Sequence, residues 1–321
     1  MIRVVSVSMW CLLGFAGTAV AQAYPNRPIQ FVVPYPPAGG NDIFARVLAR
    51  PLQESLGQNV VVENRAGAGG TIGTASVARA TPDGHTLLLG SSGALSIASS
   101  LIPKLPYNAM KDLAPITMLA SAPNIVAVHP SVPAASVKQL IALGKGKSLE
   151  LTFGSSGIGG SGHLAGELFN AMAGLKMTHV PYRGTGLSVT GLVSGEIAVT
   201  FENMMILLPH VKAARVRALA VTSPQRSPVV PELTTVAESG LIGYSAGPWF
   251  AILTTAGTPK EVVALLNREF VKILNRTDIV KVLTSVGATV TPGTPDELAE
   301  YLRTETSRWA KVIRDARITA N

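Results

Sequence analysis

A proline- and glycine-rich turn carries one set of residues suited to binding a small anion. This turn, residues 34–42, follows the apolar run Phe31–Val33, and its prolines cannot donate backbone hydrogen bonds. Asn41 or Asp42 can cap a helix that begins there. The first N–H groups of a helix have no partner inside it, so such a turn is either an anion site or an ordinary strand-to-helix connection.

A second turn, residues 154–163, follows the apolar run Leu149–Phe153 and is rich in serine and glycine. It contains a G-x-G-x-x-G spacing between Gly157 and Gly162, which is a weak dinucleotide fingerprint when taken alone. About 20 residues further on, Tyr182 stands where a dinucleotide site needs an acidic residue. The pattern therefore favours a smaller anion, a carboxylate or phosphate, held by successive backbone N–H groups.

The sequence gives less support to a site for nucleophilic catalysis or for metal binding. Residues 90–94 come close to the G-x-S-x-G nucleophile motif but fail at its last position. An exported hydrolase that uses Ser155, Ser156 or Ser161 with His163 remains the alternative to a binding protein. No metal site and no cofactor are expected, since the histidines lack metal-binding spacing: His85, His129, His163, His179 and His210.

Other strand ends could line the same cleft. Ser91 and Ser92 follow one apolar run, residues 179–186 form a third glycine turn, and Glu202 and Asn203 follow another apolar run. Glycine-rich strand ends that meet in one place form a cleft between two domains. Aromatic candidates for the distal end of a ligand are Tyr35, Tyr182, Trp249 and Phe250.

The elements that must position these residues alternate between strand and helix, which predicts parallel or mixed sheets covered by helices. The sequences Thr258-Pro259-Lys260-Glu261 and Thr294-Pro295-Asp296-Glu297 predict two helix starts with capping boxes. The further strands are expected near residues 60–63, 86–90, 116–119, 125–129, 177–180, 197–201, 216–221 and 250–254.

Residues 1–23 read as a secretory signal peptide. Arg3 precedes an apolar run, Met9–Val20, and the small residues around Ala23 suit cleavage after that position. The run is shorter than the roughly 18 to 20 apolar residues of a membrane span. We therefore expect an exported protein, and the only cysteine, Cys11, lies within the signal.

The remaining chain is long enough for two domains of roughly 100 to 200 residues each. The formal net charge of the full sequence, +8, is spread thinly, aromatic residues are few, and no nucleic-acid-binding module is visible. Nucleic acid is not an expected partner. A mildly basic surface suits small anions or an acidic partner.

Several motifs, in order, resemble the Bug family of extracytoplasmic solute-binding proteins, which serve tripartite tricarboxylate transporters. The resemblance covers essentially the whole chain after the signal. It is carried by Tyr24-Pro25-Asn26-Arg27-Pro28-Ile29, residues 33–42, Val62-Glu63-Asn64-Arg65-Ala66-Gly67-Ala68-Gly69-Gly70, Pro82-Asp83-Gly84-His85-Thr86-Leu87, residues 154–157, residues 163–169, His179-Val180-Pro181-Tyr182-Arg183-Gly184, Leu219-Ala220-Val221-Thr222 and Trp309-Ala310-Lys311-Val312.

The resemblance implies an α/β, two-domain periplasmic-binding-protein fold of type II, a Venus flytrap in which each domain has a mixed, mainly parallel sheet flanked by helices. Residues 24–122 and 248–321 would form domain 1 and residues 123–247 domain 2. Such a receptor does no chemistry: it captures a small organic acid or amino acid and delivers it to membrane transporter subunits or a sensor. We expect a monomer.

In that family the first and second turns grip a carboxylate through backbone groups, hydroxyls and waters. Neither turn holds a Lys or Arg. Carried over and combined with the residues above, the predicted ligand-binding set is Pro37, Ala38, Gly39, Gly40, Asn41, Asp42, Ser91, Ser92, Ser155, Ser156, Gly157, Gly160, His163, Tyr182, Glu202, Asn203, Trp249 and Phe250.

The chain departs from the usual family pattern at Ala38, where glycine is common, at Leu187 and Thr234, where proline is common, and at Glu202, where aspartate is usual. If Glu202 points into the cleft, its longer carboxylate narrows the pocket. It would then disfavour a second negative charge on the ligand and favour an ammonium or hydroxyl.

Overall fold

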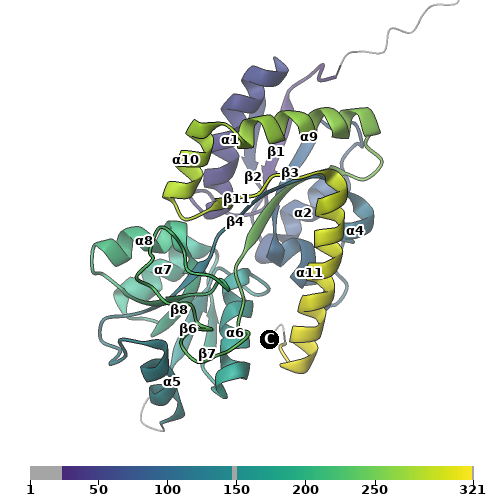
Figure 1. The fold of residues 1–321 in the computed structure, drawn as a ribbon. Helices are drawn as coiled ribbons and strands as arrows, with labels where there is room; N and C mark the ends of the chain where they lie inside the picture. The colour runs from purple at the N-terminus through teal and green to yellow at the C-terminus, as the bar shows by residue number, and fades with distance from the viewer. Residues whose placement is uncertain (1–23, 147–149, 320–321) are drawn as a thin grey trace, which may run out of the picture.

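The computed structural model describes residues 24–146 and 150–319, which form two lobes, each built on one sheet with helices against it (Figure 1). The expected signal peptide and Leu149 lie outside the described residues. The chain passes from the first lobe to the second between Ser121 and Asn124 and returns before Trp249. The two-domain α/β prediction is confirmed.

The first sheet has the strand order β11-β4-β10-β3-β1-β2. Strand β1 pairs in parallel with β2 and β3, whereas β10 runs antiparallel to β3 and β4, so the sheet is mixed. The strands are β1 (Ile29–Val33), β2 (Val60–Asn64), β3 (Thr86–Ser91), β4 (Leu113–Ser121), β10 (Trp249–Thr255) and β11 (Thr289–Val290). The helices of this part are α1 (Gly40–Leu56), α2 (Thr71–Ala78), α3 (Ala98–Leu101), α4 (Ala109–Asp112), α9 (Lys260–Leu274) and α10 (Thr277–Ser285), with short helical turns at Ala68–Gly70 and Gly93–Ile97.

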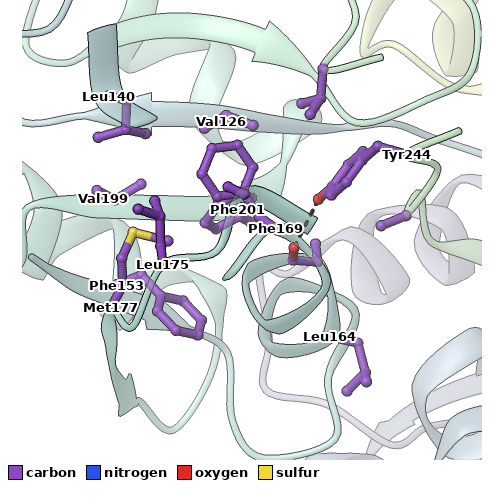
Figure 2. Packing of buried hydrophobic residues seen from close by; sticks show 14 of the residues in the cluster. Val126, Leu140, Phe153, Leu164, Phe169, Leu175, Met177, Val199, Phe201 and Tyr244 are labelled. Carbon is purple, nitrogen blue, oxygen red and sulfur yellow. Dashed lines mark hydrogen bonds between the residues drawn. The ribbon is translucent and has the colours of Figure 1, made fainter. Parts of the chain in front are cut away.

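The second sheet has the order β7-β6-β8-β5-β9, in which only β5 runs against its neighbours. Its core is aromatic: Phe201 packs edge-on against Phe153 at 5.9 Å between ring centroids, and the Tyr244 hydroxyl donates to the Ala165 carbonyl over 2.8 Å (Figure 2). The elements are β5 (Asn124–Val128), β6 (Thr152–Ser155), β7 (Thr178–Pro181), β8 (Val199–Asn203), β9 (Arg217–Val221), α5 (Val137–Lys145), α6 (Ser161–Ala173), α7 (Thr185–Ser194) and α8 (Met204–Lys212).

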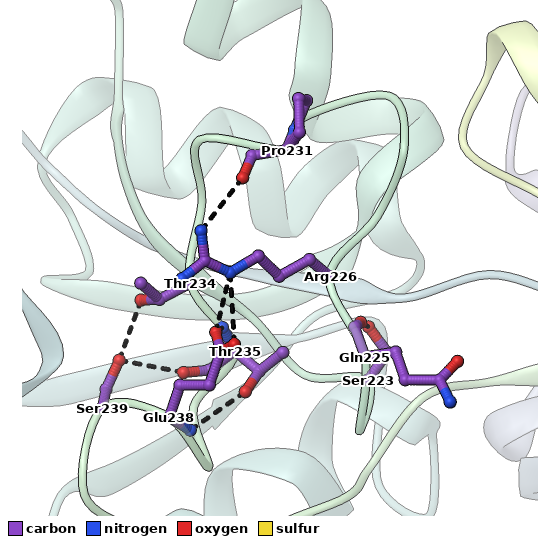
Figure 3. A network of polar contacts seen from close by, with 8 residues as sticks. All are labelled: Ser223, Gln225, Arg226, Pro231, Thr234, Thr235, Glu238 and Ser239. Atoms are coloured by element: carbon purple, nitrogen blue, oxygen red, sulfur yellow. Dashed lines mark hydrogen bonds and ion pairs between the residues drawn. The ribbon is translucent and has the colours of Figure 1, made fainter.

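The long segment between β9 and β10 has no helix or extended strand, and polar contacts fix its path (Figure 3). The Arg226 guanidinium donates to both carboxylate oxygens of Glu238, and Glu238 in turn accepts from the Thr235 amide over 2.9 Å. Thr234 and Ser239 join their hydroxyls over 2.9 Å. The hydroxyl of Thr234, one of the positions that depart from the family pattern, therefore has a defined role in holding this segment.

Two expected helix caps are wrong. Helix α1 begins at Gly40 with Gly39 as its N-cap, so neither Asn41 nor Asp42 caps it. Helix α9 has no side-chain cap, because the buried Thr258 hydroxyl donates to the carbonyl of Thr255 instead. The other expected capping box, at Thr294, is confirmed with both of its hydrogen bonds present.

Helix α11 (Pro295–Asp315) packs against both lobes (Figure 1). Leu302 lies in a core cluster of the first lobe, and Ile313 lies in the core cluster of the second. Among the described residues no helix, α11 included, is long and apolar enough to cross a membrane. Helix α11 thus contributes to both cores, whereas the other elements that follow Pro248 belong to the first lobe.

Glu305, near the middle of α11, is buried where the lobes meet. Its Oε2 accepts from the indole N–H groups of Trp249 and Trp309 at 3.1 and 3.2 Å. The Arg308 guanidinium donates to both oxygens of Glu305 and also to the Ser245 carbonyl. A single buried carboxylate therefore joins β10, α11 and the segment that returns to the first lobe.

Replacing Glu305 by Ala should lower the free energy of unfolding by about 3 kcal/mol, because two buried indole N–H groups and a guanidinium lose their acceptor. Glu300→Ala is the matched control: Glu300 also pairs with an arginine three residues on, but in solvent, where such pairs contribute below about 1 kcal/mol. Urea denaturation of both variants checks this. Equal losses in the two variants would contradict it.

Candidate functional site

A cavity of about 290 Å³ lies between the lobes, where several strands end. Its walls offer hydroxyls, amides, one guanidinium and one carboxylate. The first lobe contributes Tyr35, Pro36, Pro37, Gly39, Gly40, Asn41, Ser91, Pro248 and Phe250. The second lobe contributes Ser156, Gly160, Ser161, Arg183, Gly184, Thr185, Gly186, Leu187, Glu202 and Asn203.

Three helices begin at this cavity: α1, α6 and α7. Their N-caps are Gly39, Gly160 and Gly184, and no side chain caps any of the three. The first N–H groups of each helix have no acceptor within it, and the helix dipole places partial positive charge at the same end. The three ends together make the cavity attractive to an anion.

Asp42 fixes the turn before α1 from outside the cavity. Its carboxylate accepts from the Ala38 amide, from Arg46 Nε and from Asn64 Nδ2, each at 2.9 Å. Burial alone would raise the pKa of Asp42, but these hydrogen bonds outweigh it and hold the pKa below its usual value. Ala38 has a φ of 62°, a left-handed conformation that an L-residue adopts only when its surroundings hold it.

The serine-glycine turn before α6 is fixed by two stacked histidines. Ser155 Oγ lies 2.7 Å from His179 Nε2 and accepts from the Gly157 amide. His163 Nδ1 accepts from the Gly159 amide, and its ring stacks on His179 at 4.1 Å. Burial lowers the pKa of His163 to about 3 and that of His179 to about 4, so both rings are neutral near pH 7.

This arrangement does not support the serine-hydrolase alternative. Ser155 is fully buried, lies outside the cavity and pairs with His179 rather than His163. Ser156 and Ser161 line the cavity, but Nδ1 of His163 is already engaged by a backbone amide. A serine nucleophile needs an adjacent, available base.

Among the described residues that line the cavity, Glu202 supplies the one carboxylate. It is the penultimate residue of strand β8 and is only 3% exposed. Burial raises its pKa to about 7, against smaller lowering effects from the hydroxyls of Thr185 and Ser188 and from nearby backbone amides. The Oε1 atom of Glu202 has no hydrogen-bond partner among the described residues.

The structure brings together ten residues of the predicted set at the cavity: Pro37, Gly39, Gly40, Asn41, Ser91, Ser156, Gly160, Glu202, Asn203 and Phe250. Gly157 and Tyr182 line an adjoining hollow beside Tyr35 and Arg183. Six do not line this cavity: Ala38, Asp42, Ser92, Ser155, His163 and Trp249. Several of these six position the turns, as described for Asp42, Ser155 and His163.

The cavity also contains residues outside the predicted set. Arg183 supplies the one basic side chain among the described lining residues, and residues 184–187 supply the third helix start. The sequence carried a signal for them, because residues 179–186 repeat the strand, glycine, helix pattern of the other two turns. Tyr35, which the sequence suggested only as an aromatic contact, bonds through its hydroxyl to Ser91 and Gly69.

Comparisons with known proteins agree with this geometry. Residues 44–318 match the family model described as tripartite tricarboxylate transporter family receptor. The chain is 42% identical to Protein BugT of Bordetella pertussis over 303 residues, which is 94% of this chain and 93% of BugT.

Two solved structures with bound ligands are also similar. The R. palustris protein Rpa4515 with adipate has a TM-score of 0.88 at 34% identity, covering 92% of this chain and 99% of that one. MatC from Rhodopseudomonas palustris with bound malate has a TM-score of 0.86 at 32% identity, covering 90% of this chain and 100% of that one.

Glu202→Gln should make stability less dependent on pH. Because burial raises the folded-state pKa to about 7 from an ordinary 4.5, the wild-type protein loses stability as pH rises across that interval. The variant should gain up to about 3 kcal/mol relative to wild type between pH 4 and pH 8.

Thermal or urea unfolding at several pH values measures this, with exposed Glu232→Gln as the control. A stability difference that stays constant with pH would show that Glu202 is ionised normally.

Proposed function

We propose a function for this chain, which belongs to the tripartite tricarboxylate transporter receptor family and is a periplasmic solute-binding receptor. It binds a small organic carboxylate in the cavity between its lobes and delivers this ligand to the membrane subunits of such a transporter. A sensor is the second possible recipient. We propose that it acts as a monomer without catalytic activity. Residues 1–23 would direct export and be removed after Ala23.

The observation that carries the proposal is the meeting of three uncapped helix N-termini at one cavity. Each end can stabilise an anion by up to ~2 kcal/mol, and a charge-assisted hydrogen bond adds ~1.5 to 3 kcal/mol. After ordering costs, these terms are enough for micromolar binding, which needs ~8 kcal/mol.

Relatives make a carboxylate the natural ligand class. The two similar structures described above hold adipate and malate, both small organic acids with carboxylates. The cavity of about 290 Å³ suits a molecule of that size better than a nucleotide. Which carboxylate this chain binds depends on its own wall residues.

We also propose that residues 24–122 with 248–321 and residues 123–247 close on the ligand as two domains. Close backbone approaches between the lobes support this. A Cβ atom on Gly69 would lie 2.5 Å from the Ile158 carbonyl oxygen, and one on Gly93 would lie 3.0 Å from that of Gly159. Glycine at these positions lets the lobes meet around the cavity.

A carboxylate panel tests the proposal directly. Purified mature protein, checked by native mass spectrometry for copurified ligand, is mixed with mono-, di- and tricarboxylates and amino acids in a thermal shift assay. At 100 times its dissociation constant, a true ligand stabilises the folded protein by about 2.7 kcal/mol. A flat response from ligand-free protein across the whole panel would overturn the proposal.

Gly40→Val should weaken binding more than loss of the cavity's arginine. A Cβ on Gly40 would lie 3.5 Å from Asn203 Nδ2, so a branched side chain obstructs both the α1 amides and the facing lobe. We expect at least about a tenfold rise in Kd, against a smaller rise for Arg183→Ala, whose side chain is exposed at the rim.

Isothermal titration calorimetry with the best ligand of the panel measures both variants. The reverse order of effects would show that the guanidinium, not the backbone, holds the carboxylate.

A further inference from the structure

Glu202 lies where it must face any ligand in the cavity. It is the penultimate residue of β8 and lines the cavity wall with its neighbour Asn203, the last residue of the strand. Its carboxyl carbon would lie 3.6 Å from a Cβ atom on Gly162, in the first turn of α6, and the Thr185 hydroxyl at the start of α7 is also near. The Glu202 carboxyl group therefore sits between two of the three helix N-termini.

The protein leaves this carboxylate partly unsatisfied. Glu202 is 3% exposed, and its Oε1 has no hydrogen-bond partner among the described residues. No lysine or arginine forms an ion pair with it among the described residues; Arg183 lines the same cavity but is exposed. Leaving a buried acceptor without a donor is unfavourable, so a hydrogen-bond donor supplied by the ligand would make the binding free energy more favourable.

A second anionic group on the ligand would meet the opposite situation. Two carboxylates brought together in a buried site repel, and one of them must take up a proton. Burial raises the pKa of Glu202, so its ionised form is already disfavoured at this point before a second anion is brought near. Hence the helix N-termini attract an anionic group of the ligand, and the cavity wall at Glu202 selects a hydrogen-bond donor.

We propose that the ligand is a carboxylate that also carries a hydroxyl or ammonium group, and that this group donates to Glu202 while the carboxylate binds at the helix N-termini. The inference rests on the proposed function and narrows its ligand class. Glu202 is then the residue that distinguishes hydroxy and amino acids from plain mono- and dicarboxylates of the same length.

Matched ligands separate the two kinds of donor. Calorimetric titrations compare butyrate with its 2-, 3- and 4-hydroxy and amino derivatives, and succinate with malate and aspartate. At least one substituted acid should bind wild-type protein about tenfold or more tightly than its plain parent, since a site built around a polar contact rejects ligands that lack it. The derivatives that gain affinity over the plain parent acid show whether the site requires a hydroxyl or an ammonium group.

Variants test whether Glu202 causes the preference for substituted over plain acids. In Glu202→Ala the substituted and plain acids should bind within about threefold of each other, and in Glu202→Gln, the variant of similar volume, succinate should gain affinity relative to butyrate. Ser161→Ala is the control: it removes another hydroxyl of the cavity wall and should change the affinities of plain and substituted acids by the same factor.

Circular dichroism confirms that each variant is folded. Equal binding of plain and substituted acids to wild-type protein, or a preference that survives in both Glu202 variants, would overturn the inference while leaving the carboxylate receptor intact. If no carboxylate of either kind binds, the proposed function fails and this inference fails with it.

Discussion

The structure depends on leaving the N-termini of three helices without side-chain caps at one cavity. An uncapped helix start is unfavourable unless water or a ligand satisfies its N–H groups. Gly39, Gly160 and Gly184 occupy the cap positions of α1, α6 and α7, where the chain could have used serine, threonine or aspartate. Away from the cavity, Ser136 and Thr294 do cap α5 and α11, although α9 and α10 also lack a side-chain cap. What distinguishes α1, α6 and α7 is that their uncapped N-termini meet at one cavity.

Polar groups behind the cavity wall hold these starts in place. Asp42 fixes the turn before α1 through three hydrogen bonds, and the pair Ser155 and His179 fixes the turn before α6. Because these groups use their own acceptors and donors on the turns, the amides at the front stay available. Where the lobes meet, Glu305 joins elements of both through its indole and guanidinium partners.

Much of this could be predicted from sequence, and the exceptions have physical causes. The strand and glycine-turn pattern located the sheets, and the first and second turns do reach the cavity. The caps at Asn41, Asp42 and Thr258 were wrong because these side chains bond to other groups. Asn41 donates to the Leu89 carbonyl, Asp42 accepts from the Ala38 amide, and Thr258 donates to the Thr255 carbonyl. The path of α11 across both lobes was missed because a helical repeat of apolar residues does not say which core they enter. His163 and Trp249 have the residue types of a binding site, but only the fold shows that they lie behind the wall.

The most direct measurement is a crystal structure of the protein with the tightest-binding carboxylate from the panel. The account predicts a ligand carboxylate within hydrogen-bonding distance, directly or through one water, of first-turn amides from at least two of α1, α6 and α7. A ligand bound outside this cavity, or one whose carboxylate is held by Arg183 alone with no backbone amide near it, would contradict the account.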